Sequence, residues 1–441
     1  MKNFMFVVVL FIWACNSKSN YTHFTADPVK YAKTVKELNN IVLENNFPPM
    51  IAARNYAYAS IAAYECMVAG DSSWQSLYGQ IKHMPEMPNP EPGVKIDFDL
   101  ASLLAFVKVG NAVTFPEGSM MKHYEKLVLE ADSMGMPSSM LKSTKQFADT
   151  IAGAVLAWSK KDHYSKTRGA SRYTVDETPG RWVPTPPMYA TAVEPHWMEI
   201  RPFVLDSAYE LTCPKPPVFD VKNTNSIYYK ALMEVKHTVD SLTEEQKHIA
   251  DFWDDNPFKM NVTGHVMYAT KKFSPGGHWL NIVGIAAEKA NADLHTTIAA
   301  YAQTSIALFD GFISCWTEKF TSNYIRPETV INQLVDHNWQ PYLQTPPFPS
   351  YVSGHSTISA ATAEVMTSYF GEMAFTDTSS VEFGIKSRSF PSFRAAAQEA
   401  SISRLFGGIH YRFDLNEGNT LGRKVGELVL QRLTFKKTVK Q

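Results

Sequence analysis

The 441-residue sequence contains little cysteine and has no excess of charge of either sign. Its 4 cysteines are too few for a fold that depends on a network of disulfides. The 42 lysines and arginines balance 43 aspartates and glutamates, which gives a formal net charge of -1. No bulk attraction for nucleic acid or for an anionic membrane is therefore expected, and any anion site must be built locally from a few cations.

No membrane-spanning segment is predicted after residue 20, and no convincing alternation typical of a β-strand appears. Disorder is excluded as well, because 45% of the residues are apolar and 19% are charged. Apolar residues recur at spacings of three and four almost throughout, which predicts an all-α protein. The expected helices cover residues 28–45, 50–68, 98–112, 118–134, 139–161, 225–239, 243–254, 278–290, 292–318, 354–370, 390–406 and 418–433.

The N-terminus carries a short apolar run that ends at a cysteine. This run, Phe4–Ala14, is too short to span a bilayer and is typical of the apolar part of a secretory signal. The sequence IWAC at residues 12–15 resembles the bacterial lipoprotein signal, in which the chain is cut before the cysteine and the thiol is lipidated. An uncleaved apolar N-terminus is the alternative. On the lipoprotein interpretation, residues 1–20 are signal peptide and tether, and Cys15 anchors an exported protein in the bacterial cell envelope.

A ten-residue sequence occurs twice in related form. Residues 56–65 (YAYASIAAYE) match residues 301–310 (YAQTSIALFD) at Tyr, Ala, Ser, Ile and Ala, and the aromatic and acidic positions at the end match in kind. We interpret the match as a duplicated helical bundle. Close helix packing also favours small residues, so an independent origin is the alternative.

The duplication divides the chain into two predicted halves. Residues 21–190 are expected to be a helical scaffold, and residues 191–441 are expected to be the catalytic half. The two copies differ in chemistry, because Lys319 follows the second copy at the position where Trp74 follows the first.

Cations, histidines and glycines concentrate in three segments of the second half. The segments are Lys319–Pro327 (KFTSNYIRP), Pro349–Ser356 (PSYVSGHS) and Ser403–Asp414 (SRLFGGIHYRFD). Together they provide Lys319 and two guanidinium groups, whose geometry matches the oxygens of a tetrahedral oxyanion. Ser353 and Gly354 stand where a helix is expected to begin, so their hydroxyl and N–H groups can donate to the same anion.

Two histidines complete this pattern. His355 and His410 provide what an oxyanion reaction requires, a general acid–base on one side and a nucleophile or ligand on the other. Asp414 lies four residues after His410 and can accept the second ring N–H of that histidine. Each element alone is commonly incidental, but their joint occurrence in this order predicts a catalytic oxyanion site.

The three segments resemble the signature of the superfamily that contains type 2 phosphatidic acid phosphatases and vanadium haloperoxidases. The spacing is intact in all three parts, and Val352 stands where the family usually has proline. The resemblance implies an all-α fold, with two related bundles of the four-helix type. It also implies an oxyanion cradle that consists of Lys319, Arg326, Ser353, Gly354 and Arg404.

The same resemblance implies the roles of the remaining residues. His410 would bind the central atom, either as the ligand of vanadium or as the nucleophile, with Asp414 as its partner. His355 would be the acid–base. The segments 252–255 (FWDD) and 275–279 (PGGHW) also resemble bacterial members of the group, with Asp255 expected beside Arg404.

The superfamily includes two reaction types, because the same cradle can hold phosphate or vanadate. Trp316 and Phe348 resemble positions that line the halide side of vanadium chloroperoxidases, although ordinary core packing would also explain them. They favour an enzyme that oxidises halide with hydrogen peroxide on vanadate, with Lys319 polarising the bound peroxide. The main alternative is an acid phosphatase that hydrolyses a phosphomonoester through His410. A non-catalytic lipoprotein that binds a partner is the second alternative, and the sequence leaves homo-oligomer formation open.

Overall fold

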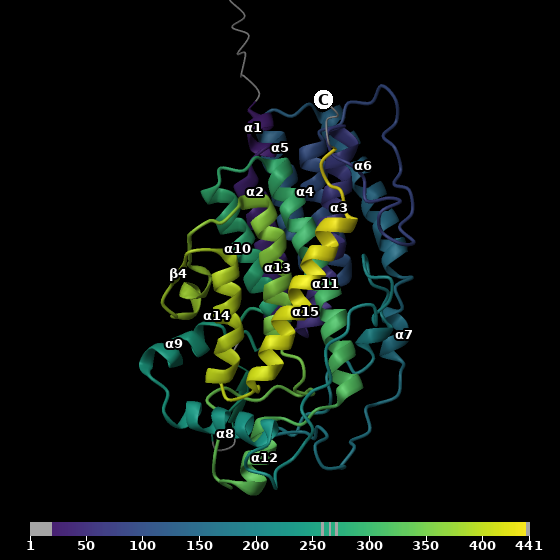
Figure 1. Cartoon of the computed structure of the whole chain (residues 1–441). Coiled ribbons are helices and arrows are strands. Elements are labelled where there is room, and N and C mark those ends of the chain that lie inside the picture. Colours follow the sequence, from purple (N-terminus) through teal and green to yellow (C-terminus); the bar gives the residue numbers. More distant parts are fainter. Residues whose placement is uncertain (1–19, 257–259, 264–265, 270–271, 438–441) are drawn as a thin grey trace, which may run out of the picture.

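The computed structural model describes residues 20–256, 260–263, 266–269 and 272–437. The predicted lipoprotein segment, including Cys15, lies outside the described residues except for Asn20. Helices dominate the described part of the chain, so the prediction of an all-α fold is confirmed (Figure 1). The first half contains α1 (Tyr21–Thr25), α2 (Pro28–Glu44), α3 (Pro49–Gly70), α4 (Phe98–Val113), α5 (Met121–Ser133), α6 (Ser138–Ser159) and α7 (Tyr164–Arg168). The second half contains α8 (Ile227–Asp240), α9 (Glu244–Phe252), α10 (Pro275–Lys289), α11 (Leu294–Ser322), α12 (Pro327–Leu334), α13 (Gly354–Phe370), α14 (Phe393–Phe406) and α15 (Arg412–Arg432).

Two short strand pairs accompany the helices. Strands β1 (Met260–Thr263) and β2 (Val266–Ala269) form one antiparallel pair, and β3 (Phe375–Asp377) and β4 (Arg388–Phe390) form another. Each strand has only three or four residues, which is too short for an alternating pattern to stand out in a sequence.

Two helix boundaries near the predicted site also differ from expectation. Helix α15 begins at Arg412 instead of residue 418, because the Asp414 carboxylate accepts the backbone N–H of Tyr411 and caps the first turn. Helix α12 was not predicted. It begins at Pro327, directly after Arg326, and proline is well suited to the first position of a helix.

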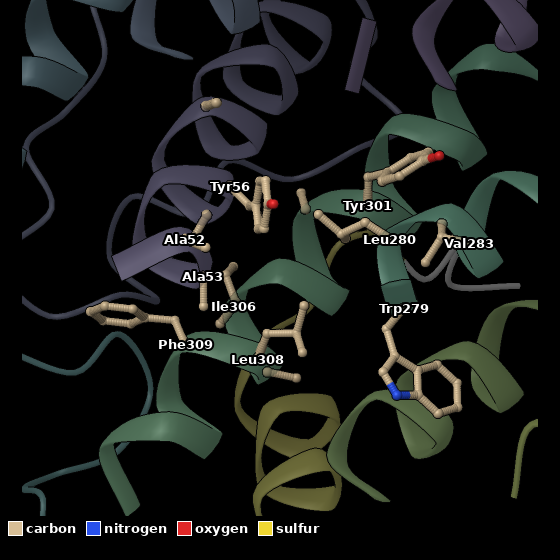
Figure 2. Close-up of a cluster of buried hydrophobic side chains, with 14 of the residues drawn as sticks. Ala52, Ala53, Tyr56, Trp279, Leu280, Val283, Tyr301, Ile306, Leu308 and Phe309 are labelled. Carbon is tan, nitrogen blue, oxygen red and sulfur yellow. The ribbon is translucent and has the colours of Figure 1, made fainter. Parts of the chain in front are cut away.

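The two copies of the repeat lie on α3 and α11, which pack against each other in one continuous apolar core (Figure 2). The Oγ atoms of Ser60 and Ser305, which are equivalent positions of the repeat, are 3.4 Å apart. The equivalent acidic residues also act alike, because Glu65 accepts the backbone N–H of Leu77 and Asp310 accepts that of Phe203. The resemblance between the copies therefore extends to their contacts, while the boundary at residue 190 stays a prediction.

A stripe of three glycines brings α15 unusually close to α13, and the two helices run side by side in Figure 1. A Cβ atom at Gly422 would lie 2.0 Å from the carbonyl oxygen of Thr357. At Gly426 and Gly418 the nearest backbone oxygens would lie 2.6 and 2.9 Å away. Only glycine permits this approach, which sets the position of Asp414 on α15 relative to the start of α13.

Helix α11 is long and apolar enough to cross a bilayer, but its apolar window is fully buried inside the protein. It lies at the centre of the fold and carries Lys319 in its last turn. The three described cysteines, Cys66, Cys213 and Cys315, are free thiols.

Candidate active site

The predicted site residues converge at the end of the bundle where α12 lies (Figure 1). Lys319 comes from the last turn of α11, Ser353 caps α13, and Arg404 lies in the last turn of α14. Gly354, His355, Arg404 and His410 line a small pocket with a volume of about 40 Å³, and the other predicted cradle residues lie outside its lining. Its lining residues are Pro49, Asp254, Asp255, Asn256, Pro275, Phe312, Trp316, Gln344, Pro346, Phe348, Gly354, His355, Arg404, Ile409 and His410.

His410 is held in one tautomer by its neighbours. Its Nδ1 lies 2.9 Å from the Oδ2 atom of Asp414, an oxygen that also accepts a 2.5 Å hydrogen bond from the hydroxyl of Ser350. Burial lowers the pKa of His410 well below its usual value, and the positive charges of Arg326 and Lys319 lower it further. The imidazole is therefore neutral, with its proton on Nδ1 facing Asp414 and a lone pair on Nε2. A lone pair on Nε2 is what either a vanadium ligand or a nucleophile requires.

Arg326 combines three satisfied hydrogen bonds with one unpartnered atom. Its Nε donates to the carbonyl of Phe348 at 2.9 Å, and Nη1 donates to the carbonyl of Ile409 at 2.7 Å. Nη1 also lies 3.1 Å from Nε2 of His410. The remaining nitrogen, Nη2, is buried without a hydrogen-bond partner among the described residues. A buried, unsatisfied guanidinium nitrogen is costly, and an oxyanion would satisfy it.

Lys319 lies beneath the pocket and does not line it. Its Nζ donates to the carbonyls of Pro349, Ser350 and Val352 at 2.9, 3.0 and 2.6 Å. All three N–H groups are thereby used to hold the loop before α13, and burial lowers the pKa of the ammonium. In this arrangement Lys319 contributes charge and loop geometry, while the expected contact with peroxide stays a prediction.

His355 faces the pocket with an unsatisfied ring nitrogen. Its Nε2 has no hydrogen-bond partner among the described residues and lies 3.9 Å from Oδ2 of Asp255. Burial and the charge of Arg404 lower the pKa of His355 well below its usual value, so the ring is neutral. The backbone of Trp253, which hydrogen-bonds to His355, also accepts from Nη2 of Arg404. The carbonyl of Trp253 thus holds the side chains of both His355 and Arg404 in position.

Two aromatic rings form the apolar wall of the pocket. The rings of Trp316 and Phe348 lie with their centroids 5.0 Å apart, and the indole Nε1 donates to the carbonyl of Val193. Because that bond satisfies the indole N–H, the rings present only apolar surface to the pocket. The structure therefore brings both predicted halide-side residues together with the two histidines.

Sequence reasoning missed part of the surroundings. Asp255 was expected beside Arg404, and its charge does act on that residue, but its direct partner is His278. The other ring nitrogen of His278 lies 2.9 Å from Oδ2 of Asp377. The hydrogen bond from Ser350 to Asp414 was missed too. In each case the only sequence signal was a polar residue within an apolar stretch. Such a residue does not indicate which side chain it will contact.

The donors around the pocket fit a tetrahedral oxyanion. Nη2 of Arg326 is a buried donor without a partner among the described residues, and Gly354 presents the start of α13, where backbone N–H groups are free. Within the described residues there is no cluster of three or more His, Cys, Asp and Glu side chains of the kind that holds a metal cation. The residues therefore fit vanadate or phosphate, both of which are anions.

Comparison with known proteins places the chain in a family. Residues 332–437 match the family model of the second helical-bundle domain of VCPO. A bacterial vanadium-dependent iodoperoxidase superimposes with a TM-score of 0.89 and 39% identity, covering 94% of this chain and 98% of its own. The holo form of a bacterial vanadium-dependent chloroperoxidase superimposes with a TM-score of 0.66 and 18% identity, covering 88% and 92%, which shows a shared fold.

Among curated protein sequences, none matches this chain. The relatives of known structure are vanadium-dependent peroxidases, which implies vanadate as the cofactor. With a relative of 39% identity over nearly its whole length, this chain belongs to the vanadium-dependent haloperoxidase family and is an enzyme.

Proposed function

We propose that this enzyme oxidises a halide with hydrogen peroxide, using vanadate held at His410, and that iodide is its preferred halide. The observation that carries the proposal is the composition of the pocket, in which His355 and His410 lie with the apolar rings of Trp316 and Phe348. Its volume of about 40 Å³ admits peroxide and a halide ion.

The apolar wall supports iodide as the substrate. Trp316 and Phe348 offer a halide no hydrogen bond to replace its water, so an ion that enters must lose part of its hydration. Iodide is the largest and least strongly hydrated of the common halides and loses the least. The 39% identity to a bacterial iodoperoxidase supports the same choice.

The protein's own groups have distinct tasks in this proposal. Vanadate, when bound, supplies a Lewis acid that activates peroxide. His410 offers Nε2 as its ligand, and Asp414 keeps the proton of that ring on Nδ1. Nη2 of Arg326 and the N–H of Gly354 bind and orient the anion, while Lys319 and Arg404 add positive charge around it. His355 accepts a proton from the entering peroxide at Nε2, which has a lone pair and no competing partner.

A paired assay on the purified full chain tests the proposal. Orthovanadate is titrated while the oxidation of iodide or bromide by peroxide and the hydrolysis of p-nitrophenyl phosphate are followed in parallel. We expect halide oxidation to rise with vanadate, iodide to react faster than bromide, and hydrolysis to stay at background. The His410→Ala variant should lose the oxidation, while His237→Ala, an exposed histidine on α8, should keep it. If vanadate inhibits hydrolysis and no halide oxidation is seen, the enzyme is instead a phosphatase.

Export and lipid attachment through Cys15 are a separate part of the proposal. The IWAC sequence supports it, and labelling with radioactive palmitate in a bacterial host tests it. We expect label in the wild-type chain and none in Cys15→Ala. Equal labelling of the two would contradict a lipid anchor at this residue.

A further inference from the structure

Behind the pocket, a fully buried histidine lies between two carboxylates. His278 is in the first turn of α10, and its Nδ1 lies 3.1 and 3.0 Å from the two carboxylate oxygens of Asp255. Its Nε2 lies 2.9 Å from Oδ2 of Asp377 on β3. The ring stacks on Trp253 with centroids 4.8 Å apart and is inaccessible to solvent. We call Asp255, His278 and Asp377 the carboxylate clamp.

The geometry of the carboxylate clamp sets the charge of His278. A carboxylate can only accept a hydrogen bond, so both ring nitrogens must carry a proton and the ring is an imidazolium. Burial opposes this charge, but the two carboxylates raise the pKa of His278 to about 10. Asp377 has a second support, because its Oδ1 accepts the backbone N–H of Ser379 at 2.8 Å. The clamp is thus two anions around one buried cation.

Asp255 links the carboxylate clamp to the reacting groups. It lines the pocket, and the oxygen that lies 3.0 Å from His278 is also 3.9 Å from Nε2 of His355. That distance is too long for a hydrogen bond but short enough for a strong charge interaction in a buried site. Nε2 of His355 is the atom that has no other partner among the described residues. Burial and the positive charges of Arg404 and His278 lower the pKa of His355, and the Asp255 carboxylate is the anion that lies against this atom and opposes them.

We propose that His278 is a positioning residue, which as a buried imidazolium holds the Asp255 carboxylate against His355 and so stabilises the proton that Nε2 of His355 accepts. No bond forms or breaks within the clamp, and the proton moves only between the substrate and His355. The inference rests on the proposed function insofar as His355 acts as the acid–base. It assigns a task to the PGGHW segment, which sequence reasoning related only to bacterial members of the family.

The chain contains a matched control for this proposal. His295, at the start of α11, lies between Asp71 and Asp99, with ring nitrogens 2.9 and 2.8 Å from their oxygens. It is the same chemical arrangement, but none of its three residues lines the pocket. Replacing either histidine by glutamine removes a cation from between two carboxylates, at a buried site for His278 and at a partly exposed site for His295. The control therefore reports what this loss does to kcat away from the pocket, and the melting temperatures of the two variants report its cost in stability.

The test compares His278→Gln and His295→Gln at a temperature at which both are folded by circular dichroism. We expect kcat for halide oxidation to fall about 10- to 100-fold in His278→Gln, because a general acid–base loses part of its support. KM for peroxide and the vanadate Kd from equilibrium dialysis should change less than about threefold, because the cradle of Arg326 and Gly354 is untouched. His295→Gln should keep wild-type kcat. Equal kcat values in the two variants, or a loss confined to vanadate binding, would overturn the proposal.

Two further measurements keep the inference separate from the proposed function. Asp255→Asn preserves the shape of the side chain and removes its charge, and it should reproduce the loss of kcat. Nitrogen NMR of the vanadate-free enzyme should show a histidine with both ring nitrogens protonated at about pH 8, absent from His278→Gln. A neutral ring would overturn the proposal whatever reaction the enzyme catalyses. If the wild-type chain hydrolyses phosphomonoesters instead, the proposed function fails, and the same kcat comparison is made on that reaction.

Discussion

Replacing Gly422 by alanine should disturb the active site from a distance, through the packing of α15 on α13. The new Cβ would lie 2.0 Å from the carbonyl oxygen of Thr357, a contact with backbone that no side-chain rotation can relieve. Overpacking of this kind costs typically about 1–3 kcal/mol and occasionally more, so we expect about 3 kcal/mol. The better helix propensity of alanine returns less than about 1 kcal/mol.

The expected change in melting temperature follows from the size of the protein. At about 2.1 cal/mol/K per residue, the unfolding entropy of 441 residues is roughly 0.9 kcal/mol/K, so a loss of 3 kcal/mol lowers Tm by about 3 °C. The vanadate Kd, measured by equilibrium dialysis, should rise at least about tenfold, because Asp414 would move with α15 away from the start of α13.

Gly153→Ala is the control for this substitution. Gly153 is an exposed glycine on α6, and a Cβ added there would meet nothing within 4 Å. That variant should melt at or slightly above the wild-type temperature and bind vanadate normally. If Gly422→Ala also melts within about 1 °C of wild type and keeps its vanadate affinity, the close approach of the two helices does not support the site.

Three further outcomes are expected. Arg326→Lys keeps the charge but removes the unpartnered Nη2, so the vanadate Kd from dialysis should rise at least about tenfold, and an unchanged Kd would exclude this nitrogen from the cradle. Phe348→Ala removes one wall of the pocket and should raise KM for iodide with a smaller change in kcat, which steady-state assays check; a change in kcat alone would contradict a halide-side role. The hydrogen bonds with Asp99 and Asp71 raise the pKa of His295 to about 9. The protonated ring therefore stabilises the folded protein fully below the ordinary histidine pKa of about 6.5, and this contribution to stability is lost as pH rises through 9. The melting temperature of wild type should therefore fall more between pH 6 and pH 9 than that of His295→Gln, and equal falls would refute this.

Local signals were enough to predict where several of the proposed cradle residues lie in the fold. Ser353 is a typical helix cap, and the start of α13 at Gly354 was predicted from it. The helix expected over 292–318 ended before Lys319, which lies in the last turn of α11. His410 and Asp414 are four residues apart, and their contact depends on a short stretch of chain. The order and spacing of these residues were therefore sufficient to predict which of them belong to the candidate site.

Contacts between distant segments could not be predicted in this way. His278 lies 23 residues from Asp255 and 99 residues from Asp377, and these three residues come from different elements that only tertiary packing brings together. The three hydrogen bonds of Lys319 to the loop before α13 depend on the same packing, as does the pocket volume. The start of α15 at Arg412 was not predicted, because the first turn of this helix contains polar residues and so lacks a clear apolar periodicity.

The packing of α3 against α11 has a consequence for how the chain is made. Outside the folded protein, α11 would be an apolar helix long enough for a bilayer to accept it. Because α3 precedes it in the chain, one of the helices that cover α11 has already been synthesised when α11 emerges, whereas α13 and α15 follow it. Helix α3 is thus available to pack against the helix that carries Lys319 when that helix emerges, and in a circular permutant that begins at α11 it would not be.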